Sequence, residues 1–68
     1  MSQEKVSEAR VAALSKAGLT PGKVGREQNS YEDDGSVEFS FYARRGGKKF
    51  LARVRVAPNG AATVLDSA

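Results

Sequence analysis

Two short segments with the same alternating pattern constrain the fold of this chain more than any other feature. Within residues 37–43 and within residues 50–56, every second side chain is apolar. Successive side chains of a β-strand point to opposite faces, so each segment predicts a strand with one buried face. Gly46-Gly47 lies between them and favours a two-residue turn, which predicts an antiparallel hairpin.

A two-residue turn also sets the register of this hairpin. The buried face then carries four apolar pairs: Val37 with Val56, Phe39 with Val54, Phe41 with Ala52, and Ala43 with Phe50. The opposite face pairs Glu38 with Arg55, Ser40 with Arg53, Tyr42 with Leu51, and Arg44 with Lys49. Because a slip of one residue would mix the two faces, the apolar pattern predicts this register.

The segment before the hairpin predicts a helix over residues 3–17. Ser2 is a suitable N-cap, and Gly18 followed by Leu19 is typical of a Schellman-type helix end. The side chains expected on one apolar face of this helix are Val6, Ala9, Ala13, Leu14 and Ala17. These are mostly small, which favours close packing of the helix against a sheet.

Two further strands are expected on either side of the hairpin. Residues 23–32 are polar, which is typical of an edge strand or a loop, and they end at the turn Asp33-Asp34-Gly35. The segment Ala57-Pro58-Asn59-Gly60 predicts a type I turn with a left-handed glycine, followed by a strand over residues 61–65 that buries Ala62 and Val64.

The expected fold is therefore one small α+β domain spanning residues 1–68. Its N-terminal helix packs on one face of a three- to four-stranded antiparallel meander, in the order α-β-β-β-β. The second face of the sheet has nothing left in the chain to cover it.

Composition excludes most enzyme chemistry. The 68 residues include no His and no Cys, so the chain lacks the usual zinc ligands, a thiol nucleophile and a serine–histidine relay. Glu32-Asp33-Asp34 lacks the spaced ligands of a calcium loop and is interpreted as a polar turn. We expect a non-enzymatic domain with no cofactor, no metal and no small-molecule substrate.

Charge and hydropathy bear on location and partners. No signal-peptide-like run opens the chain and no segment is apolar enough to insert into a membrane. A cytoplasmic protein is expected, or an extracytoplasmic one if a leader has been removed. Residues 43–68 hold six basic and one acidic side chain, so the C-terminal part is the cationic one.

The uncovered sheet face is the first candidate binding surface. It is expected to present a mixture of apolar and cationic side chains to a protein partner or to a second copy of the chain: Tyr42, Leu51, Arg53, Arg55 and Leu65. The same face could stack bases on Tyr42. An ordinary solvated face with apolar groups covered by Arg and Lys stems is the alternative.

The tip of the predicted hairpin is the second candidate. Four cations surround the glycines and could contact nucleic-acid phosphates: Arg44, Arg45, Lys48 and Lys49. Basic residues near a turn also keep a hairpin soluble, so the pattern alone has low specificity.

Arg10 is an unexpected charge near the centre of the apolar helix face. The favoured interpretation is that its side chain snorkels to the edge of the sheet. The alternative is an ion pair with Glu27 or Glu32 that holds the helix on the sheet.

The layout resembles that of a small PepSY-type domain. The resemblance is carried by Ala13-Leu14 and Ala17-Gly18 at the helix end, the acidic turn at Asp33-Asp34-Gly35, the glycine hairpin, and a closing strand-turn-strand over residues 54–65. It implies a non-catalytic interaction or inhibitory module, usually extracytoplasmic. The chain departs from the family in Ala57-Pro58-Asn59-Gly60, where an acidic strand end followed by Thr-Gly is common.

Overall fold

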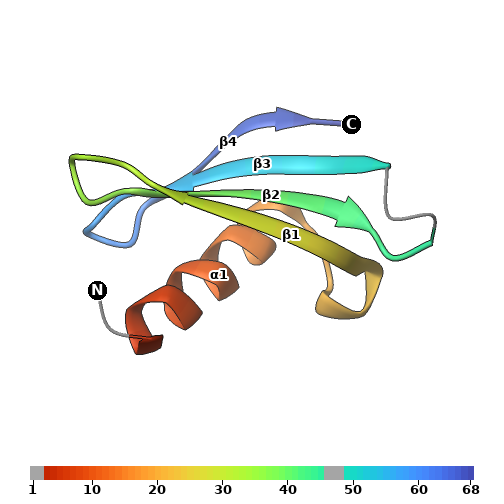
Figure 1. The fold of residues 1–68 in the computed structure, drawn as a ribbon, viewed down its shortest axis with the longest axis horizontal. Helices are drawn as coiled ribbons and strands as arrows, with labels where there is room; N and C mark the ends of the chain where they lie inside the picture. Colours follow the sequence, from red (N-terminus) through yellow and green to blue (C-terminus); the bar gives the residue numbers. More distant parts are fainter. Residues whose placement is uncertain (1–2, 46–48) are drawn as a thin grey trace.

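A helix followed by a four-stranded meander forms the fold (Figure 1). The computed structural model describes residues 3–45 and 49–68. Its elements are α1 (Gln3–Ala17), a short 3₁₀ turn (Pro21–Lys23), β1 (Val24–Tyr31), β2 (Val37–Ala43), β3 (Phe50–Val56) and β4 (Ala62–Ser67). The strands are antiparallel and lie in the order β1-β2-β3-β4. The α-β-β-β-β prediction is confirmed, with β1 as an edge strand.

The helix ends where the sequence predicts. The Leu19 N–H donates a hydrogen bond to the Leu14 carbonyl (2.9 Å), and the Gly18 N–H donates to the Ser15 carbonyl (3.1 Å). Gly18 has a φ of 70°, which a residue with a side chain rarely adopts. This is a Schellman end. The predicted N-cap Ser2 lies outside the described residues.

The core lies between α1 and one face of the sheet. Its fully buried apolar side chains are Ala13 and Leu14 from α1, and Val37, Phe39, Phe41, Ala52, Val54 and Val56 from β2 and β3. Ala62 and Val64 of β4 are half-buried and pack against this core. Within the described residues, no segment covers the opposite side of the sheet, called the outer face below (Figure 1).

The β1–β2 and β3–β4 turns have the same construction. Gly35 and Gly60 both have a φ near 90°, and each donates its N–H to the carbonyl three residues earlier, Glu32 or Ala57. Asp34 Oδ1 accepts the Ser36 N–H (2.9 Å), as Asn59 Oδ1 accepts the Ala61 N–H (3.0 Å). The predicted type I turn with a left-handed glycine is confirmed at residues 57–60.

The Asp34 contact predicts a pH dependence of stability. The hydrogen bond from the Ser36 backbone N–H lowers the pKa of Asp34 below its ordinary value of 3.8. A carboxylate whose pKa is lowered by folding stabilises the native state above its unfolded pKa, and this stabilisation is lost as the pH falls through the folded pKa. The Asp34→Asn variant keeps an acceptor oxygen but does not titrate.

Urea unfolding of both proteins between about pH 6 and pH 2 tests this linkage. The advantage of the wild type over Asp34→Asn should be constant near neutral pH and should shrink below pH 3.8. A stability difference that does not change with pH would contradict the assigned role of the carboxylate.

The register of the central hairpin is confirmed for five pairs and wrong for the rest. Residues 37–41 pair with residues 56–52 as predicted. The pairing then shifts, so that Tyr42 lies opposite Phe50 and Leu51 is left as an extra residue in β3. The Ala43 N–H donates to the Lys49 carbonyl (2.8 Å), so the predicted pairs of Ala43 with Phe50 and of Arg44 with Lys49 do not form.

This bulge moves two side chains to faces opposite to the predicted ones. Leu51 packs against the core, whereas Phe50 lies against the Tyr42 ring. The physical reason is that a bulged residue and its neighbour share one face of the sheet, which interrupts the two-residue period. The predicted turn at Gly46-Gly47 lies outside the described residues, as does Lys48.

Arg10 makes the ion pair that was the less favoured alternative. Its Nε lies 2.6 Å from Glu27 Oε1, and both side chains are about one-third exposed. Glu27 lies opposite the buried Phe41 in the β1–β2 register, so its side chain is on the helix side of the sheet. The contact joins α1 to the edge strand β1, so the Arg10 side chain reaches the sheet edge, and there it is paired with a carboxylate.

Candidate interaction surface

The outer face is organised in three cross-strand rows. Its side chains alternate along β2 with the buried Val37, Phe39 and Phe41, and paired residues on neighbouring strands share its direction. The rows are Ser30, Glu38, Arg55 and Thr63; Gln28, Ser40, Arg53 and Asp66; and Arg26, Tyr42 and Phe50. The face is therefore mostly polar, with its aromatic side chains at one end.

The third row, called the aromatic row below, brings two rings and a guanidinium together. The Tyr42 and Phe50 rings meet edge to face, with centroids 6.0 Å apart and planes at 72°. The guanidinium carbon of Arg26 lies 5.7 Å from the Tyr42 ring centroid, which is cation–π distance. Both rings are half-buried and Arg26 is exposed.

Two irregularities in the strands produce this row. Gly25 is an extra residue in β1, between Val24, which pairs with Ala43, and Arg26, which pairs with Tyr42. A Cβ atom on Gly25 would lie 2.4 Å from the Arg44 Cα atom, so only glycine allows β1 to pass so close to the end of β2. The other irregularity is the bulge at Leu51 that turns Phe50 outward.

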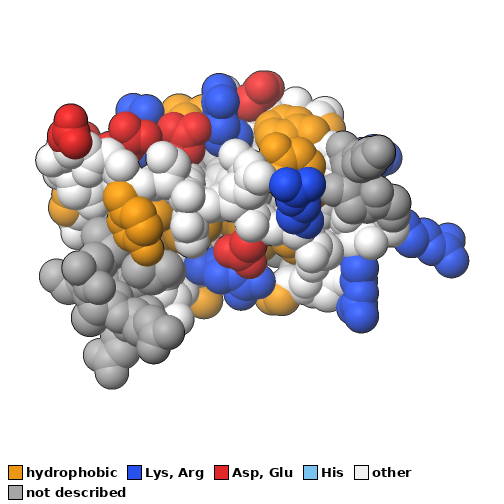
Figure 2. Space-filling view, in the orientation of Figure 1, with side chains coloured by type: hydrophobic (Ala, Val, Ile, Leu, Met, Phe, Trp, Pro, Cys, Tyr) orange, Lys and Arg blue, Asp and Glu red, His pale blue; other side chains and the backbone are white. Residues whose placement is uncertain are grey.

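In the first two rows, acidic groups neutralise the arginines. Glu38 carries two ion pairs, with Arg53 Nε at 3.4 Å from Oε1 and Arg55 Nη2 at 3.5 Å from Oε2. The predicted register places Arg55 directly opposite Glu38, whereas Arg53 lies opposite Ser40 and contacts Glu38 from the next row. Figure 2 shows acidic and basic side chains interspersed along the side of the sheet away from α1. These arginines are less available to a partner than the sequence suggested.

Unpaired cations gather at the end of the sheet next to the aromatic row. This basic end is defined here by Lys23, Arg44, Arg45 and Lys49, all exposed. The Arg44 N–H donates to the Lys23 carbonyl (3.1 Å), which joins the start of β1 to the end of β2. In the described part of the chain, neither these four side chains nor Arg26 forms an ion pair.

The acidic turn Glu32-Asp33-Asp34 lies at the opposite end of the sheet, because it connects β1 to β2 at their other ends. Figure 2 shows basic side chains at one end of the long axis and acidic side chains near the other. Charge is thus separated along the molecule.

The structure brings together some predicted site residues and separates others. Tyr42, Arg53 and Arg55 lie on the outer face, and Arg44, Arg45 and Lys49 lie at the adjoining basic end. Leu51 leaves the outer face for the core. Leu65 is 40% exposed but is an extra residue in β4, so Asp66 takes the place opposite Arg53.

Sequence reasoning missed Phe50, Arg26 and Lys23 as site residues. Phe50 was assigned to the core because the alternating pattern includes it. An isolated glycine within a polar strand often marks a bulge, so Gly25 offered a signal for the close approach that brings Lys23 beside Arg44.

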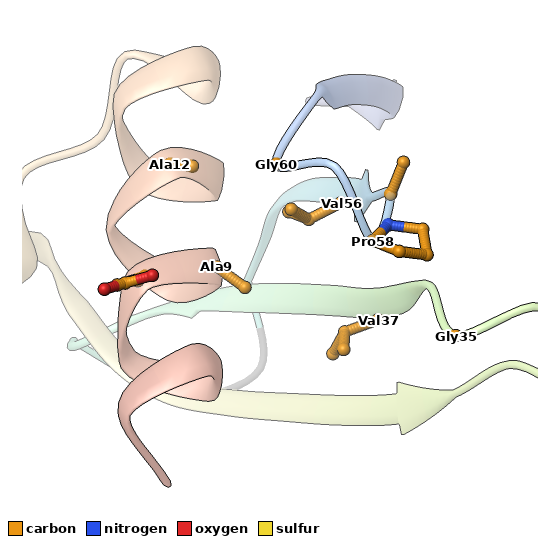
Figure 3. Close-up of a pocket in the computed structure, with 9 residues that line it drawn as sticks. Ala9, Ala12, Gly35, Val37, Val56, Pro58 and Gly60 are labelled. Carbon is orange, nitrogen blue, oxygen red and sulfur yellow. The ribbon is translucent and has the colours of Figure 1, made fainter. Parts of the chain in front are cut away.

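A pocket of about 100 Å³ opens between α1 and the ends of β2 and β3 (Figure 3). Ala9 and Ala12 line one side, and Val37, Val56 and Pro58 line the other. Glu8 is the one ionisable residue among those lining it. A single carboxyl group is not the pair of groups that two-carboxylate acid–base catalysis uses.

Within residues 3–45 and 49–68, no three His, Cys, Asp or Glu residues are grouped so that they could hold a metal ion. No helix there is long and apolar enough to cross a membrane.

Comparisons with protein-family models, curated proteins and solved structures find no match to this chain. The resemblance to PepSY-type domains stays a prediction.

Proposed function

We propose that this chain is a small non-enzymatic interaction module that binds nucleic acid at its basic end and on the adjoining aromatic row. The observation that carries the proposal is the grouping of exposed cations beside the two aromatic rings. None of these cations forms an ion pair among the described residues. Cations neutralise phosphate, and aromatic rings stack on bases.

The binding free energy expected in this proposal is mainly electrostatic. Each phosphate neutralised by Lys or Arg releases condensed counterions, so affinity falls steeply with salt. If the four cations of the basic end each contact a phosphate, log K should fall with log salt at a slope of roughly −3 to −4. Such binding needs no deep pocket, which suits an open sheet face.

The second candidate is a protein partner, including a second copy of the chain. The uncovered outer face favours it, because exposed aromatic side chains are common at protein interfaces. Two findings reduce its support: Leu51 packs on the core, and Arg53 and Arg55 are paired with Glu38. The remaining apolar part of the face is confined to the aromatic row.

A salt series with a matched variant tests the proposal. A labelled mixed-sequence oligonucleotide, DNA or RNA, is titrated with protein between about 50 and 200 mM salt. The Arg44→Gln/Arg45→Gln variant should bind more weakly, with a salt slope smaller by about 2. The control, Lys5→Gln/Lys16→Gln, removes the same charge from α1 and should leave the slope nearly unchanged.

If both variants lose the same amount of affinity for the oligonucleotide, the protein is attracted by its net charge alone. This result would contradict a site at the basic end. Light scattering on the same samples tests the second candidate. A dimer that persists at high salt and retains no oligonucleotide would instead support a protein interface on the outer face.

A further inference from the structure

We infer that the nucleic acid recognised here is single-stranded and that one of its bases stacks on the aromatic row. This inference rests on the proposed function and names its ligand class. It starts from the geometry of Arg26, Tyr42 and Phe50, which lie on three neighbouring strands at one level of the sheet.

The row offers two kinds of stacking surface. The Tyr42 ring is flanked by the Arg26 guanidinium on one side and by Phe50 edge to face, so its position is fixed from two directions. Guanidinium planes and aromatic rings both stack on unpaired bases. A base can extend the stack over Arg26 or lie against the half-exposed Phe50 ring.

The position of the row relative to the basic end favours a strand that passes across the sheet. Lys23 ends the 3₁₀ turn three residues before Arg26 of β1, and Arg44 follows the end of β2 two residues after Tyr42. A base on the row therefore places its neighbouring phosphates toward Lys23 and Arg44. On the other side of the row, Glu38 and Asp66 balance the charges of Arg53 and Arg55.

A duplex cannot use this arrangement. Its bases are already stacked on one another, and unstacking one costs a few kcal/mol. A single strand offers accessible bases as well as phosphates, so the aromatic row should bind a single strand more tightly than a duplex.

The test compares three probes of equal phosphate count: oligo-dT, an abasic single strand and a blunt duplex of mixed sequence. We expect oligo-dT to bind most tightly. In Phe50→Leu and in Arg26→Lys, oligo-dT affinity should fall roughly 5- to 150-fold, while affinity for the abasic strand changes little. Arg26→Lys keeps the net charge and lies on the surface, so its effect cannot come from lost charge or from the core.

Tyr31→Leu is the matched control. Tyr31 is an aromatic residue at the other end of β1 and is 58% exposed, so its replacement should leave all three affinities unchanged. Circular dichroism checks that each variant is folded.

The outcomes separate this inference from the proposed function. Salt-dependent binding of all three probes with equal affinity would overturn base stacking and leave the basic end as a nucleic-acid site. Binding of none of the probes would overturn both.

Discussion

Replacing Phe39 with alanine is expected to cost about 3–5 kcal/mol of unfolding free energy. The Phe39 side chain is fully buried and stacks on Phe41, with ring centroids 5.9 Å apart. Removing it leaves a cavity between α1 and the middle of the sheet. A domain of 68 residues has a total stability of roughly 3–10 kcal/mol, so most of the stability would be lost.

Urea unfolding followed by circular dichroism measures this loss. Because Phe39→Ala could be too unstable to yield a full curve, Phe39→Leu provides a second point with a smaller loss, under about 1.5 kcal/mol if the core repacks. The control Val11→Ala removes a side chain that is 64% exposed on α1 and should stay within about 0.5 kcal/mol of the wild type. A loss below about 1 kcal/mol in Phe39→Ala would contradict the described core.

Gly25→Ala is expected to be the most disruptive exchange outside the core. The added Cβ would lie 2.4 Å from the Arg44 Cα, and backbone cannot rotate away as a side chain can. The strands must separate, which weakens the hydrogen bond between the Arg44 N–H and the Lys23 carbonyl. We expect a loss of about 2–3 kcal/mol and weaker binding at the basic end.

The control for this exchange lies three residues earlier. A Cβ on Gly22 would meet nothing within 4 Å, so Gly22→Ala should have little effect on unfolding. If both variants unfold at the same urea concentration, β1 and β2 do not approach each other as closely as described here.

The fold could be predicted from the sequence where pattern and turn chemistry agree. The alternation in residues 37–41 and 52–56 determines which side chains are buried, and the structure confirms all of those pairs. Gly18 and Gly60 mark a helix end and a turn that require a left-handed residue, and both have a positive φ. These features depend on local chemistry that the sequence displays directly.

The candidate site could be predicted less well because it depends on bulges. Phe50 and Leu51 are adjacent apolar residues, so the sequence supplies an apolar side chain for the core whether the alternation continues to Phe50 or a bulge at Leu51 interrupts it. The choice depends on the path of β3 relative to Tyr42, which is a tertiary property. The sequence of β1 is polar throughout, so no alternating pattern shows which side of the sheet Glu27 faces. Its ion pair with Arg10 could therefore be given only as an alternative.

The separation of charge along the sheet should orient the protein before it contacts a nucleic acid. With cations at one end of a molecule that extends 32 Å and acids near the other, the protein has an electric dipole along its strands. In the field of a polyanion such a dipole feels a torque that turns the basic end forward. Encounters are then biased toward one orientation, and added salt, which screens the field, randomises the approach.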